Sequence, residues 1–520
     1  MMKGDFVHSE NKEIIIVEDN GSETKHTLSD YFVSENNDNG FYHPMNADLS
    51  YVNNKSDNHD NYKFIAKRFI QSQKNKHDYH LKAIKDKVKE VESGKIKRIT
   101  YHREGATTYD NRYKEVFACS LQLSLVLDTE IRLYLDGESN TRSLDEIADT
   151  LYHIMNFMSH TNGDPIYGIR QERLESGWVS QNISRVLDIL LHVAKYDFSK
   201  NDNVPWNNIQ DIRDTYEKNW SYFKDHQHWS TFGANWETTT LLGFKSMSIA
   251  LEEPKYWNNR YEKIWNMMLT SYYFIKKDKV PEHPSVVFTR LANGNKDVGV
   301  ERAKSLYMGK YSDESNNGSI AYDYYNTLHL WGSKYTWSQG IRTMDEARKK
   351  GVVLTQGNIG WGVGDKEDDY IIDGMVMEYT RDINHGGNGL DDLSGMIKLR
   401  LVQRESVSRD MLERVMKCGI NYTRILTDNV DEIFIDKSES KKNLRQLYRD
   451  NFKQSMQKGL VGRKYGHIAQ ELCVEFGATD KHFNERNNEI INFYKSGASG
   501  SWSQMAWEAS PIKQYLGLRN

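Results

Sequence analysis

The chain has 520 residues, of which 38% are hydrophobic and 12% aromatic, a composition that excludes an intrinsically disordered or collagen-like chain. Lys and Arg number 69 against 73 Asp and Glu, so the net charge of −4 gives no overall positive field for nucleic acid or an acidic membrane. The chain contains no run of the roughly 18–20 apolar residues that a membrane helix requires, and no signal-peptide pattern at its start. We therefore expect a soluble protein.

The cysteine pattern indicates no metal-binding or redox motif. Cys119, Cys418 and Cys473 lie far apart and form neither a Cys-x-x-Cys pair nor a zinc-binding spacing. We expect three buried free thiols, and a single disulfide stays open as the alternative.

Residues 1–60 differ from the rest of the chain, because they are rich in Asn, Asp, Ser and His. Their one compact apolar run, Ile14–Val17, predicts a short strand in an otherwise polar, loosely attached extension. From residue 61 onward, apolar residues recur mostly at helical spacing. The segments with this period are Phe117–Leu135, Ile147–Met158, Val179–Val193, Leu241–Leu251, Tyr261–Phe274, Leu390–Val402 and Met411–Leu426.

The helical pattern predicts an all-α fold. Five of the 7 prolines fall in loops between the periodic segments, as long uninterrupted helices require. Strand-like alternation is sparse, and Val352–Thr355 and Ile433–Ile435 are its best short examples. We expect helical hairpins over 61–430, arranged as a solenoid or a closed ring, with 431–520 as a helical or irregular extension packed on this body.

The segment His226–Glu237 concentrates histidine and tryptophan just before an apolar helix. Asn235 can cap that helix, and this is the purely structural interpretation. Alternatively, the aromatic faces can stack on the apolar face of a sugar ring. A zinc site from His226 and His228 lacks an indicated third ligand.

The segment Gly374–Leu390 places Glu378, Arg381, Asp382 and His385 within eight residues, followed by glycines and an apolar helix. One interpretation is a salt bridge with a capping histidine. The other is a site in which a cation binds an anion and His385 moves a proton.

Both segments resemble motifs of a known family. Glu378-Tyr-Thr-Arg-Asp-Ile-Asn-His-Gly-Gly-Asn-Gly-Leu390 resembles a motif of alginate-lyase-like polysaccharide lyases, and Gly-Ala-Asn235-Trp236-Glu237 resembles their Asn-Trp motif. The segment Leu174–Leu190, with its Gly-Trp step, is more weakly similar. The resemblance covers about residues 110–405 and implies an incomplete (α/α) toroid, which agrees with the helical pattern.

This chain departs from the family pattern in ways that mark a divergent member. The histidine that many alginate lyases carry in the Asn-Trp segment is missing, and His385 stands where many relatives place a tyrosine. The usual His and Tyr pair therefore cannot be transferred whole, and the substrate need not be alginate.

The resemblance implies β-elimination on a uronate-containing polysaccharide. Asn235 and Arg381 are expected to neutralise the uronate carboxylate, and His385 to remove the C5 proton. The acid that protonates the leaving O4 is expected to be a tyrosine, and the candidates are Tyr322, Tyr324, Tyr325, Tyr335 and Tyr379. The residues expected to bind substrate are Trp236, His228, Glu378 and Tyr325.

No metal or cofactor is expected, and the expected partner is an acidic polysaccharide rather than nucleic acid or membrane. The family resemblance implies a secreted or periplasmic location, although no signal peptide is visible. Two alternatives remain open. A glycoside hydrolase would need two carboxylates across a sugar, and a carbohydrate-binding or structural protein would need no catalytic residues.

Overall fold

The computed structural model describes the larger part of the chain, with gaps. The described residues are 6–10, 13–17, 23–27, 35–36, 40–45, 59–100, 111–135, 137–138, 142–161, 169–225, 235–259, 261–262, 265, 273–274, 374–376, 383–442, 445–446, 449, 452–453, 467–476, 480–483, 485–486, 488–489, 492 and 496.

The described chain is mostly helical, which confirms the all-α prediction. Its α-helices are α1 (His59–Glu92), α2 (Asn111–Leu135), α3 (Leu144–Ser159), α4 (Ile169–Asp188), α5 (Ile209–Asp225), α6 (Asn235–Ala250), α14 (Ile383–Val402), α15 (Arg409–Leu426) and α17 (His467–Glu475). A π-helical turn, Ile189–Val193, continues α4. Short 3₁₀ turns occur at Phe198–Lys200, Pro254–Tyr256, Val430–Ile433 and Glu439–Lys441.

Two sequence predictions need correction. Ile433, expected to begin a strand, ends a 3₁₀ turn. The helical period expected over Tyr261–Phe274 ends in a strand, because Tyr273–Phe274 (β6) pairs with Met375–Val376 (β7). The expected strand Val352–Thr355 lies outside the described residues.

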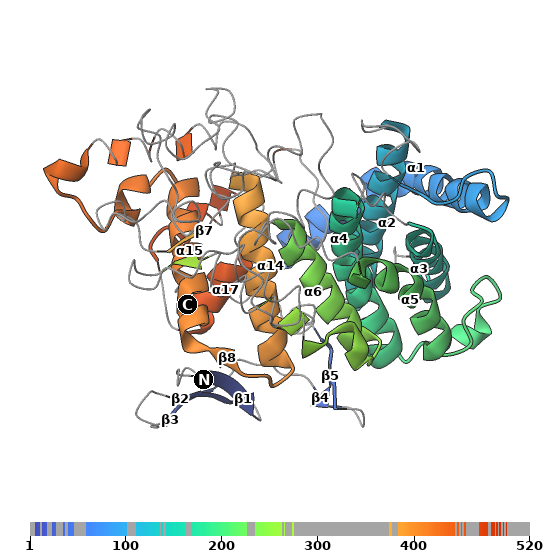
Figure 1. Cartoon of the computed structure of the whole chain (residues 1–520), viewed down its shortest axis with the longest axis horizontal. Helices are drawn as coiled ribbons and strands as arrows, with labels where there is room; N and C mark the ends of the chain where they lie inside the picture. Colours follow the sequence, from blue (N-terminus) through green and yellow to red (C-terminus); the bar gives the residue numbers. More distant parts are fainter. Residues whose placement is uncertain are drawn as a thin grey trace, which may run out of the picture.

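Helices α2, α4, α6 and α14 lie side by side in one row (Figure 1). They run parallel, because contacts between neighbours advance in the same direction along both chains. Between α2 and α4, Ser124 meets Asn182 and Asp128 meets Arg185. The contacts between α4 and α6 and between α6 and α14 advance in the same way. The N-terminal ends of these helices therefore share one edge of the row.

Helices α1, α3 and α5 pack beside this row. Helix α1 runs antiparallel to α2, since Lys63 pairs with Glu138 while His80, further along α1, meets Cys119. Helix α3 contacts α1, α2 and α5, and it begins with a capping box at Ser143 that fixes its start.

Every helix of the parallel row contributes to one continuous apolar core. Leu127, Ile183, Leu241 and Leu393 are fully buried within it. Because each helix presents an apolar stripe to two neighbours, burial of these faces is the main stabilising contribution.

The N-terminal residues form a small sheet rather than a loose strand. Strands β1 (Phe6–Glu10), β2 (Glu13–Val17), β3 (Glu23–Thr27) and β8 (Val407–Ser408) make an antiparallel sheet in the order β3-β2-β1-β8. The predicted strand Ile14–Val17 is confirmed within β2. Figure 1 shows this sheet beneath the helices.

A second N-terminal hairpin also contacts the helical body. Strand β4 (Glu35–Asn36) pairs with β5 (Tyr42–His43). The Gln403 amide, just after α14, accepts from the Tyr42 N–H at 3.1 Å and donates to the Tyr42 carbonyl at 2.8 Å. The side chain thus satisfies both backbone groups as a neighbouring strand would.

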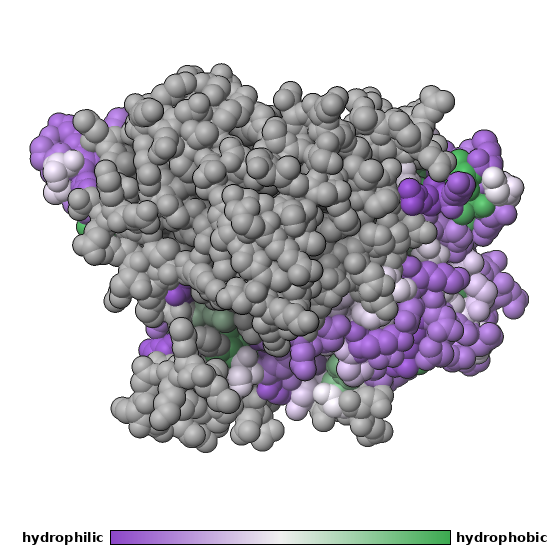
Figure 2. Space-filling model, viewed as in Figure 1, coloured by the Kyte–Doolittle hydropathy of each residue, from purple (hydrophilic) through white to green (hydrophobic). Residues whose placement is uncertain are grey.

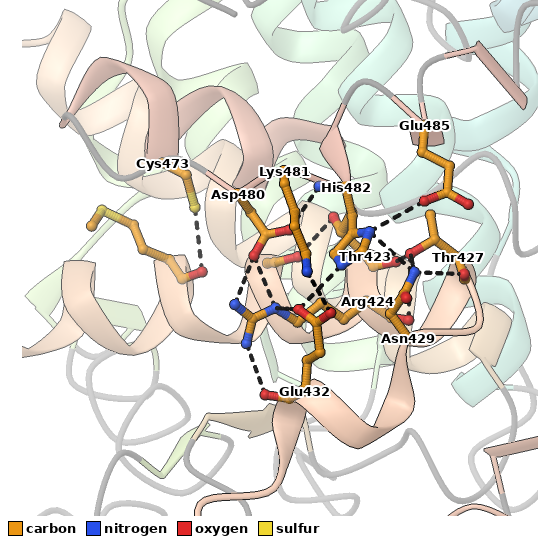
Figure 3. Close-up of polar contacts among 12 residues, drawn as sticks. Thr423, Arg424, Thr427, Asn429, Glu432, Cys473, Asp480, Lys481, His482 and Glu485 are labelled. Carbon is orange, nitrogen blue, oxygen red and sulfur yellow. Dashed lines mark hydrogen bonds and ion pairs between the residues drawn. The ribbon is translucent and has the colours of Figure 1, made fainter.

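Residues after α15 are joined to that helix by a polar network, drawn in Figure 3. Arg424 of α15 pairs with Asp480 at 2.7 Å and donates to the Glu432 carbonyl at 3.0 Å. The Glu432 carboxylate in turn meets Lys481 at 2.8 Å and His482 at 3.2 Å. These contacts fix the segment 480–482 against α15.

The surface carries little apolar area among the described residues. On the face shown in Figure 2 the described surface is mainly hydrophilic, with small apolar patches. The exposed large hydrophobic side chains that are described are scattered along the chain. No helix in the described part of the chain combines the length and apolarity needed to cross a membrane.

Candidate functional site

The candidate site lies at the edge where the parallel helices begin. Helix α4 packs very closely on α6 beside this edge. A Cβ atom on Gly177 would lie 2.9 Å from the Thr239 backbone carbon, and one on Gly243 would lie 2.9 Å from the Gly177 carbonyl. Only glycine permits this approach of two helix backbones. The contact fixes the register of α4 against α6.

Asp392 of α14 joins three helices through its carboxylate. Its Oδ2 accepts from the Thr239 hydroxyl at 2.6 Å, the Thr238 hydroxyl at 2.9 Å and the Asn388 amide at 3.1 Å. Its Oδ1 accepts from the Gln181 amide of α4 at 3.1 Å. Because the carboxylate is almost completely buried, these donors replace the water that it loses on folding.

Asn388 extends the network toward the Gly-Trp step of α4. Its side-chain oxygen accepts from the Trp178 indole N–H at 3.2 Å, and its amide donates to Thr239 at 3.1 Å. Helices α4, α6 and α14 therefore each contribute side chains to one buried cluster, here called the Asp392 network. The cluster holds the first two turns of α6 against the second and third turns of α14.

Those predicted site residues that the structure describes lie at this edge. Asn235 and Trp236 are the first two residues of α6, directly before Thr238. His385 lies in the first turn of α14, three residues before Asn388. The backbone positions of Asn235, Trp236 and His385 thus belong to the starts of two helices in contact.

The other predicted site residues lie outside the described part of the chain. These are Arg381, Glu378, His228 and Tyr325. The further candidates Tyr322, Tyr324, Tyr335 and Tyr379 also lie outside it.

The electrostatics of this edge favour anions. Each helix N-terminus carries about half a positive elementary charge from its aligned peptide dipoles. In the parallel row, the N-terminal ends of α4, α6 and α14 lie at the same edge. A carboxylate placed there would meet backbone N–H groups that have no partner within the helix.

Two ion pairs with buried cations lie at the far ends of α6 and α14. Lys245 of α6 pairs with Glu405, and Arg400 of α14 pairs with Glu262. Burial lowers the pKa of Lys245, although Glu405 opposes this. For Glu262, burial acts to raise the pKa, but Arg400, together with Trp257 and Lys245, lowers it below its usual value. These pairs fix the helices at the end away from the candidate site.

Sequence reasoning missed the residues of the Asp392 network. The weak Gly-Trp motif already included Gly177 and Trp178, and the glycine-rich segment ended near Asn388. The signal for Asp392 was a pair of acidic residues, Asp391 and Asp392, inside an otherwise apolar helix. A charged residue at a core-facing position indicates a specific buried partner.

Comparisons of the chain with protein-family models, with curated proteins and with solved structures give no significant match.

Proposed function

We propose that this protein is a polysaccharide lyase that cleaves an acidic, uronate-containing polysaccharide by β-elimination. The helical row would be part of an incomplete (α/α) toroid, with the substrate bound where the parallel helices begin. The observation that carries the proposal is the Asp392 network, which joins the start of the second turn of α6 to the second and third turns of α14. Asn235 and Trp236 begin α6 just before Thr239, and His385 lies seven residues before Asp392 on α14.

In the proposed reaction, the uronate carboxylate is neutralised first. Asn235 and Arg381 donate hydrogen bonds to it, and the helix N-termini add a favourable field. This makes the C5 proton acidic enough for a base of ordinary strength. Neutral His385 takes that proton, because an imidazole with a pKa of about 6.5 is a competent base near pH 7.

In the elimination, the C5–H electron pair forms the C4–C5 double bond, the C4–O4 bond breaks, and a tyrosine hydroxyl protonates the leaving O4. Trp236 would stack on the sugar ring, and His228, Glu378 and Tyr325 would complete the substrate contacts.

The contacts of Asp392 argue against this residue as the catalytic acid of a glycoside hydrolase. A glycoside hydrolase needs one carboxylic acid and one carboxylate that both reach the substrate. Asp392 accepts hydrogen bonds on both of its oxygens and is buried. It is therefore suited to positioning helices, and not to protonating a sugar oxygen.

The test is ultraviolet absorbance near 235 nm, which reports the unsaturated product, during incubation with a panel of uronate polymers. We expect His385→Ala and Arg381→Ala each to lower the rate by about 10²–10⁴-fold. His153→Ala on α3 and Arg409→Ala at the start of α15 are matched controls that should keep the wild-type rate, because neither residue lies at the edge where α4, α6 and α14 begin.

A reducing-end assay on the same samples separates the alternatives. New reducing ends without absorbance would establish a hydrolase. Binding without either signal would establish a carbohydrate-binding protein. Both results contradict the lyase proposal, as does an absorbance increase that His385→Ala leaves unchanged.

A further inference from the structure

A buried group of four titratable side chains lies at the opposite edge, where α4 and α6 end. It consists of His43 from β5, Asp188 and His192 from the end of α4, and Glu252 from the turn after α6. We call it the histidine cluster. Their side chains are 6%, 2%, 11% and 9% exposed, respectively. His43, Asp188 and His192 each place one possible ligand atom within 4.8 Å of the other two.

The backbone explains how three distant segments converge here. Asp188 and His192 lie four residues apart across the π-helical turn that continues α4, so both face the cluster. Met45 holds the N-terminal segment in place, because its backbone N–H donates to Asp188 Oδ2 at 2.8 Å.

Glu252 occupies a backbone position that favours glycine. Its φ of 49° is in the left-handed region, and its N–H bonds the Ile249 carbonyl while that of Glu253 bonds the Ser248 carbonyl. This is the helix-ending geometry in which glycine is usually found. A glutamate at this position strains the backbone, but it supplies a carboxylate that glycine lacks.

The hydrogen bond from His192 to the Ala250 carbonyl determines which ring nitrogen carries the proton. Its Nε2 lies 2.9 Å from the Ala250 carbonyl, which can only accept, so Nε2 carries the hydrogen. Nδ1 is then the nitrogen with the lone pair, and it lies 3.6 Å from Glu252 Oε1. A histidine held in this way by a backbone carbonyl is the usual arrangement of a metal ligand.

His43 is also held by a hydrogen bond from one ring nitrogen, and here the acceptor is a carboxylate. Its Nδ1 lies 2.5 Å from Asp188 Oδ1 and donates to it. Its Nε2 is buried, makes no hydrogen bond to any described residue, and lies 3.4 Å from Glu252 Oε1. The two imidazoles stack with centroids 3.7 Å apart, so both nitrogen lone pairs lie near the same carboxylate.

Two carboxylates meet in the cluster. Asp188 and Glu252 bring their side chains into a largely buried space. Buried carboxylates are stabilised when they are paired or coordinate a metal. One divalent cation would balance both carboxylates.

We propose that the histidine cluster binds a zinc ion through His43 Nε2, His192 Nδ1 and Glu252 Oε1, with Asp188 orienting His43. Tetrahedral zinc with bonds of about 2.0–2.1 Å separates its ligand atoms by about 3.4 Å. The Glu252 oxygen lies 3.4 Å from His43 Nε2 and 3.6 Å from His192 Nδ1. The stacked rings, now at 17° to each other, would tilt so that both lone pairs point at the ion.

The ligand types and the location define the ion and its role. Imidazole nitrogens with a carboxylate suit zinc, whereas magnesium and calcium prefer oxygen ligands alone. The three side chains leave the fourth position for a water molecule. Because the site joins the N-terminal segment to the ends of α4 and α6 and is nearly closed to solvent, we assign the ion a structural role. The inference is independent of the proposed lyase activity.

The test measures zinc in the purified 520-residue chain by mass spectrometry, after chelation and titration with Zn²⁺. We expect about one zinc per chain, and a tetrahedral visible spectrum when Co²⁺ replaces it. Asp188→Asn should weaken Zn²⁺ binding about 10–100-fold, because it disturbs the group that orients His43.

A pair of glycine variants keeps the proposal testable if histidine variants fail to fold. Glu252→Gly removes the carboxylate but suits the left-handed backbone, so it should stay folded and bind Zn²⁺ at least tenfold more weakly. Asp428→Gly is the matched control, since Asp428 also ends a helix with a φ of 61° but lies outside the cluster. Unchanged zinc affinity in Glu252→Gly would overturn the proposal. So would a folded wild type that takes up no Zn²⁺, or that selects manganese or iron over zinc.

Discussion

Asp392 accepts a 2.6 Å hydrogen bond from the hydroxyl of Thr239, across 153 positions of sequence. This contact joins the second turn of α6 to the third turn of α14, and the N-terminal ends of these helices carry residues of the two motifs that resemble those of polysaccharide lyases. The bond is buried, so the geometry of the edge depends on it more than on any surface contact. The Asp392 network is therefore the first part of the fold to test.

Asp392→Asn should destabilise the protein by about 1–3 kcal/mol, because the new amide group places a donor where the carboxylate accepted hydrogen bonds. Urea unfolding followed by circular dichroism measures the change in free energy. Asp202→Asn, at an exposed position in a turn, is the control and should lie within about 0.5 kcal/mol of wild type. Equal stability of both variants would contradict the network.

Gly177→Ala should lower the free energy of unfolding by about 1–3 kcal/mol, because the added methyl would meet the Thr239 backbone at 2.9 Å. Gly395→Ala is the control. Its methyl would meet the ends of the Leu242 and Ile468 side chains at 3.3 and 3.7 Å, which can move. The same urea measurement compares the two, and a Gly177→Ala protein no less stable than Gly395→Ala would refute the close α4–α6 contact.

The segment 480–482 should loosen from α15 as the pH falls. The hydrogen bond from Lys481 lowers the pKa of Glu432. Desolvation acts to raise this pKa, and the hydrogen bond from His482 lowers it further. A carboxyl group with a lowered pKa in the fold stabilises it above its unfolded pKa of about 4.5, and this contribution is lost at lower pH. The protection of residues 480–486 from hydrogen exchange, measured relative to the intrinsic exchange rate at each pH, should therefore fall between about pH 5 and pH 3.

Substitution separates this effect from general acid unfolding. Glu432→Gln should give faster exchange of 480–486 already at pH 7. Glu439→Gln, which alters an exposed pair with Lys442, should leave that exchange unchanged. A pH response in 480–486 that persists in Glu432→Gln would assign it to another group.

The cysteines should be unreactive in the folded protein. All three are buried and free, as the sequence predicted. Burial raises the pKa of Cys119 to about 11 and that of Cys473 further. At pH 8 the thiolate fraction of Cys119 is then on the order of 10⁻³, so labelling with a thiol reagent should be slow.

Denaturation supplies the reference for this experiment. In guanidinium chloride the reagent should label three thiols per chain. Rapid labelling of any cysteine in the native protein would show that its surroundings are open to solvent.

The helices were predictable where apolar residues recur at regular spacing, as in α2, α3, α14 and α15. Helix α5 was missed although Ile212, Tyr216 and Trp220 form a buried stripe at four-residue steps. Charged residues fill the positions between them, so the segment lacks the overall apolar character of the other helices.

The arrangement of the helices was harder to predict, because it depends on contacts between distant residues. Gly177 and Thr239, or Thr239 and Asp392, carry no local signal of their pairing. The histidine cluster was missed for the same reason, since His43 and Asp188 lie 145 positions apart. Spacing rules find metal ligands only when these are close in sequence.

The pairing of Phe6 with Ser408 has a consequence for biosynthesis. Strand β1 is made early, yet the partner for its outer edge follows α14. Until the ribosome has added those residues, β1 presents unpaired backbone groups that other chains can bind. Truncated products that end before Val407 keep this edge exposed permanently, so they should aggregate where the longer chain does not.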